Sequence, residues 1–167
     1  MCYRKLTRKD MIEIDSELIS ELFAKAEDSE RRRMNFDLRT GPEDGGQRML
    51  NALLPGTVVP VHRHPMSNEN VICLKGKLVE VLYEEVDPVL APLTGEEAAA
   101  FERGMDAMDR AAGRRLRETE RYVLDPSAGN FGCVVPAGVW HTVEVLEPSV
   151  IYEAKDGRYG EDGSCNV

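Results

Sequence analysis

Three histidines in this sequence have the spacing of metal ligands. They are His62, His64 and His141, and each lies in a short apolar segment next to turn-forming residues. His62 and His64 are two residues apart, so in a β-strand both imidazoles would project from one face, about 7 Å apart. That separation suits two ligands on one ion.

A carboxylate is expected beside this pair. Pro65 donates no backbone hydrogen bond and residues 66–68 favour a turn, so Glu69 should open a returning strand. Later in the chain, Pro136 and Gly138 make a tight turn, and His141 begins the strand that follows. One histidine on a strand is more often a packed or surface residue than a ligand. Three histidines and a carboxylate at these offsets favour a site that binds iron(II), manganese or zinc with positions left open.

Such an ion could act as a Lewis acid, lower the pKa of a bound water or, if it is iron, bind dioxygen. Asn51 should face the barrel interior with Met49 and Leu53, where it could orient a bound substrate. Arg33 and Asn35 could reach the barrel mouth. Alternatively, Asn35 and Asn51 cap turns or satisfy backbone groups. No residue is assigned a catalytic role, and Tyr83, Tyr122 and Tyr152 are interpreted as strand packing.

Short β-strands must position these residues. From Gln47 onward the chain consists of short segments rich in Val, Leu, Ile and Tyr, separated by Pro- and Gly-containing turns, which is typical of a sandwich or small barrel. The expected strands are 48–54, 57–64, 69–74, 77–84, 121–124, 131–135, 142–146 and 150–154.

The N-terminal part reads as a strand and a helix. Residues 11–14 alternate apolar and polar side chains, and Asp15 can cap a helix whose apolar face includes Leu18, Leu22 and Ala26. Two interpretations of Arg31, Arg32 and Arg33 stay open. The preferred interpretation is that they form the solvated C-terminus of this helix. The alternative is that they recognise an anion. The turn residues of 41–46 end the helical part.

An insertion is expected between the two histidine segments, over 85–120. Within it, Thr94 to Glu97 match a capping box, and residues 94–113 carry Phe101, Met105 and Met108 at helical spacing. This stripe would pack on the core or, alternatively, form a cofactor or partner groove. We therefore expect an N-terminal extension (1–46), a barrel (47–160, with the inserted segment 85–120) and a C-terminal tail (161–167).

Composition limits the function classes. The 167 residues include 30 acidic and 21 basic side chains, a net charge of -9, which argues against non-specific binding to nucleic acid or anionic membranes. No stretch reaches the roughly 18 apolar residues of a membrane span, and no apolar segment of a secretory signal follows the basic N-terminus. The four cysteines lack a C-x-x-C pair, so free thiols and a cytoplasmic location are expected.

The histidine segments resemble the two motifs of the cupin superfamily. Gly56, His62, His64, Glu69 and Gly76 stand in the spacing G-x5-H-x-H-x4-E-x6-G, and Pro136, Gly138 and His141 resemble the P-x-G-x2-H centre of the second motif. The resemblance implies a mainly β jelly-roll barrel. It also implies that His62, His64, Glu69 and His141 hold one divalent transition metal: iron(II), manganese, zinc or nickel.

A narrower resemblance is to the WbuC group of cupin-fold metalloproteins. It rests on Arg33-Met34-Asn35-Phe36, the segment 47–53, His62-Arg63-His64-Pro65 and the segment 153–157. This group is associated with bacterial polysaccharide loci, and its reaction is not established. The resemblance implies a role in polysaccharide biosynthesis.

Three functions follow as hypotheses. The first is a metal-dependent enzyme that isomerises or oxidises a small, sugar-like molecule. The second is a non-catalytic metal- or ligand-binding accessory protein or sensor, and the third is a metal-free sugar-nucleotide epimerase with a histidine base and a tyrosine acid. A homodimer is expected, because jelly-roll sheets expose edges and the strand 11–14 could pair across an interface.

Overall fold

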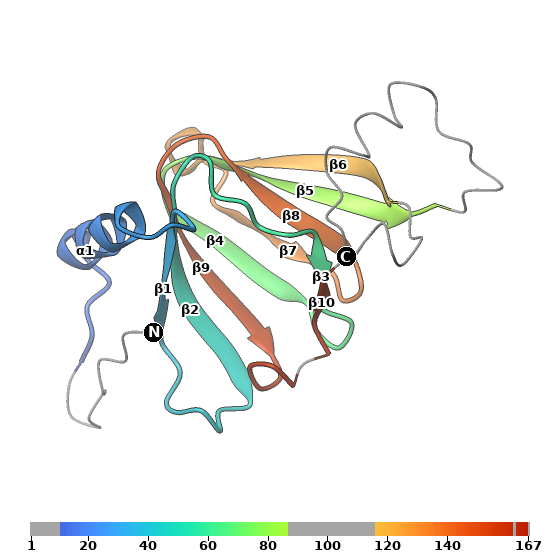
Figure 1. Cartoon of the computed structure of the whole chain (residues 1–167), viewed down its shortest axis with the longest axis horizontal. Coiled ribbons are helices and arrows are strands. Elements are labelled where there is room, and N and C mark those ends of the chain that lie inside the picture. Colours follow the sequence, from blue (N-terminus) through green and yellow to red (C-terminus); the bar gives the residue numbers. More distant parts are fainter. Residues whose placement is uncertain (1–10, 87–115, 162, 167) are drawn as a thin grey trace.

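In the part of the chain that the structure describes, two antiparallel sheets face each other and one α-helix lies outside them (Figure 1). The computed structural model describes residues 11–86, 116–161 and 163–166. In spatial order, the first sheet comprises β1 (Arg33–Asp37), β2 (Gly46–Leu53), β9 (Ser149–Asp156), β4 (Glu69–Lys75) and β7 (Gly132–Val135). The second comprises β10 (Cys165–Asn166), β3 (His62–Arg63), β8 (Trp140–Val145), β5 (Leu78–Glu85) and β6 (Leu116–Leu124).

Helix α1 (Ser16–Glu27) covers the outer face of the first sheet. Its N-cap is Asp15, whose side chain accepts hydrogen bonds from the backbone of Glu17 and Leu18 at 3.1 and 2.9 Å, which satisfies donors that the first helical turn leaves free. Leu22 and Ala26 pack on Leu50 and Ala52 of β2. The helix therefore buries one face of β2 and leaves the other face toward the space between the sheets.

The space between the sheets is apolar at one end. Side chains from both sheets meet there in a buried cluster that holds the layers together. Its members are Leu53, Val71, Cys73, Leu78, Leu124 and Ile151, and we call this cluster the floor.

Two glycines shape the turns beside the histidine segments. Gly76 has a φ of 88°, and a Cβ there would come within 2.2 Å of the carbonyl oxygen of Pro148. Gly138 has a φ of 82°, in the left-handed region that favours glycine. Both positions therefore favour the glycine that the motif spacing singled out.

Most of the expected strands are present, but the strand 57–64 is reduced to His62–Arg63. Pro60, in the middle of this stretch, lacks the N–H that a sheet ladder requires. The segment is instead held by isolated hydrogen bonds, such as the one that the Thr142 hydroxyl donates to the carbonyl oxygen of Val59 at 2.6 Å. His62 and His64 still lie near each other, with ring centroids 4.9 Å apart.

The N-terminal expectations need two corrections. Residues 11–14 form no strand. The strand that was expected to pair across a dimer interface is therefore not present at these residues. Helix α1 ends at Glu27, and Arg33 begins β1, which pairs with β2. The interpretation of Arg31 to Arg33 as a helix C-terminus is therefore wrong. Strands β1 and β10 were not expected at all.

The helix expected over 94–113 lies outside the described residues. The ends of the expected insertion 85–120 are strand, because Glu85 pairs with Leu116 where β5 and β6 meet. Cys73, Cys133 and Cys165 are free thiols, as expected. No helix in the described part of the chain has the length and apolar character needed to cross a membrane.

Candidate metal centre

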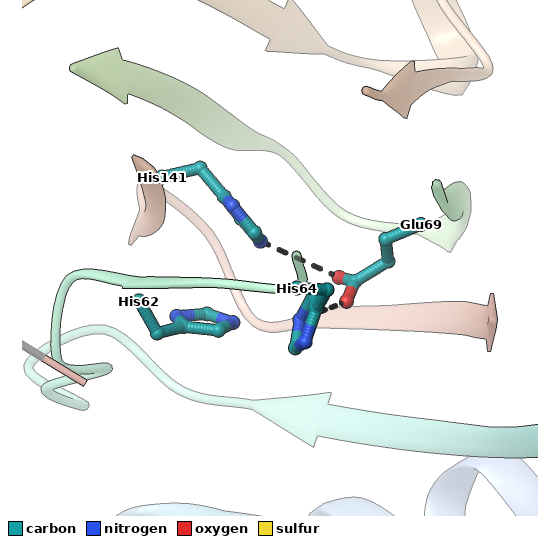
Figure 2. A group of neighbouring side chains, drawn as sticks. All are labelled: His62, His64, Glu69 and His141. Carbon is teal, nitrogen blue, oxygen red and sulfur yellow. Dashed lines mark ion pairs between the residues drawn. The ribbon is translucent and has the colours of Figure 1, made fainter. Parts of the chain in front are cut away.

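The four residues singled out in the sequence come together between the sheets. His62 pairs with His141 where β3 meets β8, Glu69 opens β4 in the other sheet, and His64 follows β3. Each offers one ligand atom, and these atoms all lie within 4.8 Å of one another. Figure 2 shows the Glu69 carboxylate between the His64 and His141 rings.

The distances within this cluster are those of interacting groups. Nε2 of His64 lies 2.6 Å from Oε2 of Glu69, and Nε2 of His141 lies 3.8 Å from Oε1. The His62 and His141 ring centroids are 4.3 Å apart. His64, Glu69 and His141 are all buried, so their charges are poorly screened by solvent.

The two histidine segments are tied together by backbone contacts. The Gly138 amide donates to the carbonyl oxygen of His64 at 2.9 Å. The Ala137 amide donates to Oδ1 of Asn68, also at 2.9 Å. The turn before His141 is therefore fixed against the turn that follows His64, which explains how residues far apart in sequence share one site.

Each histidine is held through Nδ1. His62 donates to the carbonyl oxygen of Pro60 at 2.9 Å, and His141 donates to that of Val139 at 3.0 Å. Nδ1 of His64 forms a hydrogen bond of 2.6 Å with the Ser164 hydroxyl. Partners of this kind fix the ring orientation of metal-binding histidines and leave the Nε2 lone pair for the ion.

The donor set fits a divalent metal ion. Nε2 of His141 is buried, and no group of the described residues lies within hydrogen-bonding distance of it. The Lys155 ammonium lies 3.0 Å from Nε2 of His64 and 3.3 Å from Oε2 of Glu69, so these atoms already attract a cation. Three imidazole nitrogens and one carboxylate oxygen suit iron, manganese, nickel or zinc.

Protonation states also favour a cation. Burial alone would raise the pKa of Glu69, but the neighbouring His141 and His64 rings and the charge of Lys155 hold it well below its usual value. Burial, reinforced by His141, lowers the pKa of His62 to about 4. Burial would also lower the pKa of His141, but the nearby Glu69 carboxylate raises it. At neutral pH the cluster thus contains an ionised carboxylate and a neutral His62, the forms that bind metals.

A cavity of about 320 Å³ opens from this cluster and is lined by both sheets. Arg33, Asn35 and Asn51 all line it, so the three expected substrate-binding residues lie in one place. Asn51 donates to Oε2 of Glu153 at 2.8 Å, and Arg33 donates to the carbonyl oxygen of Val58 at 3.2 Å. Asn51 thus has a side-chain partner rather than a turn to cap.

Arg31 also lines the cavity, which brings two guanidinium-bearing residues to one wall. Burial and the neighbouring charge of Arg31 lower the pKa of Arg33. Tyr83, Tyr122 and Tyr152 are not among the described residues that line the cavity, whereas Tyr159 is.

Three charged residues that line this cavity were given no role in the sequence analysis: Glu80, which is buried, and Glu153 and Lys155, which are half-buried. Burial raises the pKa of Glu153 to about 7, with a further contribution from Glu69. Glu80 and Glu153 share strand parity with the apolar floor residues Leu78 and Ile151. A charged residue at an inward-facing position of an apolar strand was the signal that could have identified them.

Comparisons with known proteins agree with this fold. A family described as a domain of unknown function (DUF6016) matches residues 14–93, and a comparison with the curated proteins found no match. Several solved structures resemble this chain at low sequence identity. One is the SPY1581 protein of unknown function from Streptococcus pyogenes, 11% identical, with a TM-score of 0.51 over 94% of this chain and 96% of that one.

Two further neighbours are enzymes. An oxalate oxidase in complex with glycolate is 15% identical with a TM-score of 0.48, covering 83% of this chain and 57% of its own. An L-ribose isomerase from Cellulomonas parahominis is 19% identical with a TM-score of 0.46, covering 75% of this chain and 61% of its own. The chain thus spans less than two-thirds of either enzyme chain.

Proposed function

We propose that the chain is a mononuclear metal-binding cupin that isomerises or oxidises a small, polar, sugar-like substrate. His62, His64, Glu69 and His141 would hold one divalent transition metal. The observation that carries this proposal is the convergence of four ligand atoms within 4.8 Å of one another at the cavity. Iron(II), manganese, zinc and nickel are all compatible with three nitrogens and one oxygen.

A bound ion would supply Lewis-acid chemistry or, for a redox-active metal, electron transfer. The chain's own residues would bind and orient the substrate. Arg33 would attract an anionic or strongly polar group, and Asn35 and Asn51 would hold hydroxyl groups by hydrogen bonds. The pairing of Asn35 with Asn51 across β1 and β2 supports this, because it places both amides on the same cavity-facing side of the sheet.

A link to polysaccharide biosynthesis is part of the proposal. Its support is the resemblance of the segments around Arg33, Gln47, His62 and Glu153 to the WbuC group. The cavity volume of about 320 Å³ suits a single small ligand rather than a polymer chain, since ligand sites of this size hold small molecules.

One observation favours a second candidate, a metal-free epimerase. Tyr159 lines the cavity together with His62 and His141, so a tyrosine and histidines are available for acid–base chemistry. The non-catalytic sensor has less support, because Glu80, Glu153 and Lys155 add titratable groups that a simple binding protein does not need.

Elemental analysis of protein purified without a histidine tag tests the proposal. We expect about one transition metal ion per chain for one mononuclear site. The double variant Glu69→Gln and His141→Ala should lose the metal, whereas Glu84→Gln should retain it. Glu84 is the matched control because it is an exposed carboxylate paired with Arg117. Wild-type protein without metal, even after incubation with each of the four candidate ions, would refute the proposal and favour the epimerase.

Turnover is tested separately. Candidate sugars are added to the metal-loaded protein while the spectrum of the metal is followed, and products are analysed. We expect a spectral change and product formation that His64→Ala abolishes. A spectral change without turnover by any candidate would favour the sensor.

A further inference from the structure

Glu80 is a buried acid on the cavity wall for which the described residues provide no hydrogen-bond partner. Its side chain lies on β5, lines the cavity and is 1% exposed. No donor among the described residues lies within hydrogen-bonding distance of either carboxyl oxygen. A buried polar group is normally satisfied, and leaving one unpaired costs stability. A glutamate at position 80 therefore lowers the stability of the fold, and packing alone gives no reason for it.

Glu153, in the same cavity, differs from Glu80 because its carboxyl group has partners. It lies on the opposite sheet, accepts a hydrogen bond of 2.8 Å from Asn51 and lies 3.6 Å from the Lys155 ammonium. Lys155 also contacts Glu69 at 3.3 Å. The Lys155 ammonium thus pairs with Glu69 and Glu153, and Glu80 forms no ion pair in the described part of the chain.

Glu80 faces the same space as the metal-binding cluster. It pairs with Val143 on β8, and His141 lies two residues along that strand on the same face. Diagonal neighbours in a sheet are separated by about 7 to 8 Å. A small molecule at the cluster could therefore reach Glu80 with a second polar group, because a few bonded atoms span that distance.

A hydroxyl group suits this carboxyl group. Burial raises the pKa of Glu80 to about 8, against the charge of His141, with additional contributions from Glu69 and Glu153. At neutral pH the carboxyl group is then mostly protonated and offers one donor and one acceptor. A hydroxyl group also donates and accepts, so it can satisfy either oxygen in either protonation state.

We propose that Glu80 is a specificity-determining residue that hydrogen-bonds a hydroxyl group of the ligand, so that the cavity selects hydroxylated molecules over their deoxy analogues. This deepens the proposed function, and it rests on that function for the position of the ligand at the cluster. Selection can be strong, because a deoxy analogue would leave the buried carboxyl group unpaired.

The test compares three purified metal-loaded proteins: wild type, Glu80→Met and Glu84→Gln. Methionine matches the length of glutamate without its polar atoms. Binding of glycerate and of propionate, three-carbon acids with and without hydroxyl groups, is measured by saturation-transfer NMR and calorimetry, with xylitol as an uncharged polyol. Metal content is measured in every sample.

We expect wild type and Glu84→Gln to bind glycerate at least about 10-fold more tightly than propionate, and Glu80→Met to lose that preference while it keeps its metal. Xylitol should bind wild type and lose affinity in Glu80→Met. Equal binding of glycerate and propionate to wild type, no binding of any probe, or an unchanged preference in Glu80→Met would overturn the proposal. The last result would mean that Glu80 contacts only cavity water.

Thermal unfolding separates this role from a structural one. Glu80→Met should melt at or above the wild-type temperature, because it removes an unpaired polar group. Glu153→Met should melt lower, because it strips partners from Asn51 and Lys155. A Glu80→Met midpoint more than about 4 °C below wild type would identify Glu80 as structural. This readout needs no metal, so failure of the inference and failure of the metal assignment are distinguishable.

Discussion

The floor and the cavity are two ends of one space, built by the same strands with opposite chemistry. On β5, Leu78 belongs to the floor and Glu80 to the cavity, and on β9 Ile151 is followed two residues later by Glu153. On β4, Glu69 precedes Val71 in the same way. Because side chains two apart share a face, a strand can change from polar to apolar without leaving that face.

The difference separates stability from function. The floor consists of apolar side chains that gain free energy on burial. The cavity contains the buried Glu69 and Glu80 and the half-buried Glu153 and Lys155, and removing such charged groups from water is unfavourable unless each finds a partner. Substitutions in the floor should therefore weaken the fold, whereas substitutions in the cavity should change what it binds.

The largest expected effect is the loss of metal from Glu69→Gln. A neutral amide replaces the ligand that carries the site's negative charge, and substitution of residues that only support metal ligands already costs about 10- to 100-fold in affinity. We expect a decrease of about 100-fold or more, measured by competition with a coloured chelator. Retention of wild-type affinity by a folded Glu69→Gln protein would remove Glu69 from the ligand set and break the contrast between the two ends.

The floor should respond in the opposite way. Leu78 is fully buried, so Leu78→Ala removes packed methyl groups and leaves a cavity that costs about 2 to 5 kcal/mol of unfolding free energy. Urea denaturation measures this loss, and the folded fraction should keep its metal. A matched Leu146→Ala substitution, at an exposed leucine, should change stability by no more than about 0.5 kcal/mol. Loss of metal from folded Leu78→Ala would show that the two ends are coupled.

Much of the metal cluster was predictable from local pattern. Two histidines at a spacing of two, a proline-containing turn and a following glutamate identify three candidate ligands from local sequence, and the alternation of Met49, Asn51 and Leu53 assigns their cavity face. The strand that Glu69 opens does not pair with the histidine strand, however, because β4 lies in the first sheet and β3 in the second. The place of His141 beside them could not be derived from local pattern, because residues far apart in sequence meet only through sheet topology.

The unpredicted features depend on long-range pairing. β1 forms a strand because it pairs with β2, although its sequence follows a helix and an arginine run. Ser164 reaches His64 only because β10 pairs with β3. Glu80 and Lys155 lie in strands that carry other charged residues as well, and only the opposite sheet determines which of these charges face the cavity.

The acids of the cavity should make stability depend on pH where the floor cannot. Glu80 has a pKa of about 8 in the fold, above its unfolded value, so the folded state holds the proton more tightly. The contribution of Glu80 to the free energy of unfolding is fully present below its unfolded pKa, and it is lost as the pH rises through about 8. Between pH 6.5 and 8 this loss is roughly 2 kcal/mol in metal-free protein, and Glu153 acts in the same direction.

Urea denaturation at a series of pH values, after metal removal by a chelator, measures that loss. The groups that bias Glu80 are His141, Glu69 and Glu153, so the slope of wild type alone does not isolate it. Glu80→Met does, because it should flatten the profile in this range while Leu78→Ala should lower the whole curve without changing its slope. A wild-type slope retained in Glu80→Met would assign the dependence to the other groups.

The smallest expected effect comes from Ser164→Ala, at the edge of the cluster. The hydroxyl holds Nδ1 of His64 at 2.6 Å, and its removal should lower metal affinity about 10-fold by loosening the ring, without removing a ligand. Unfolding free energy of the metal-free protein should change by less than about 1 kcal/mol, because one hydrogen bond contributes little net. Ser164→Thr keeps the hydroxyl and should recover most of the affinity. Equal affinity in Ser164→Ala and wild type would mean that the backbone around His64 orients its ring without the contact to Ser164.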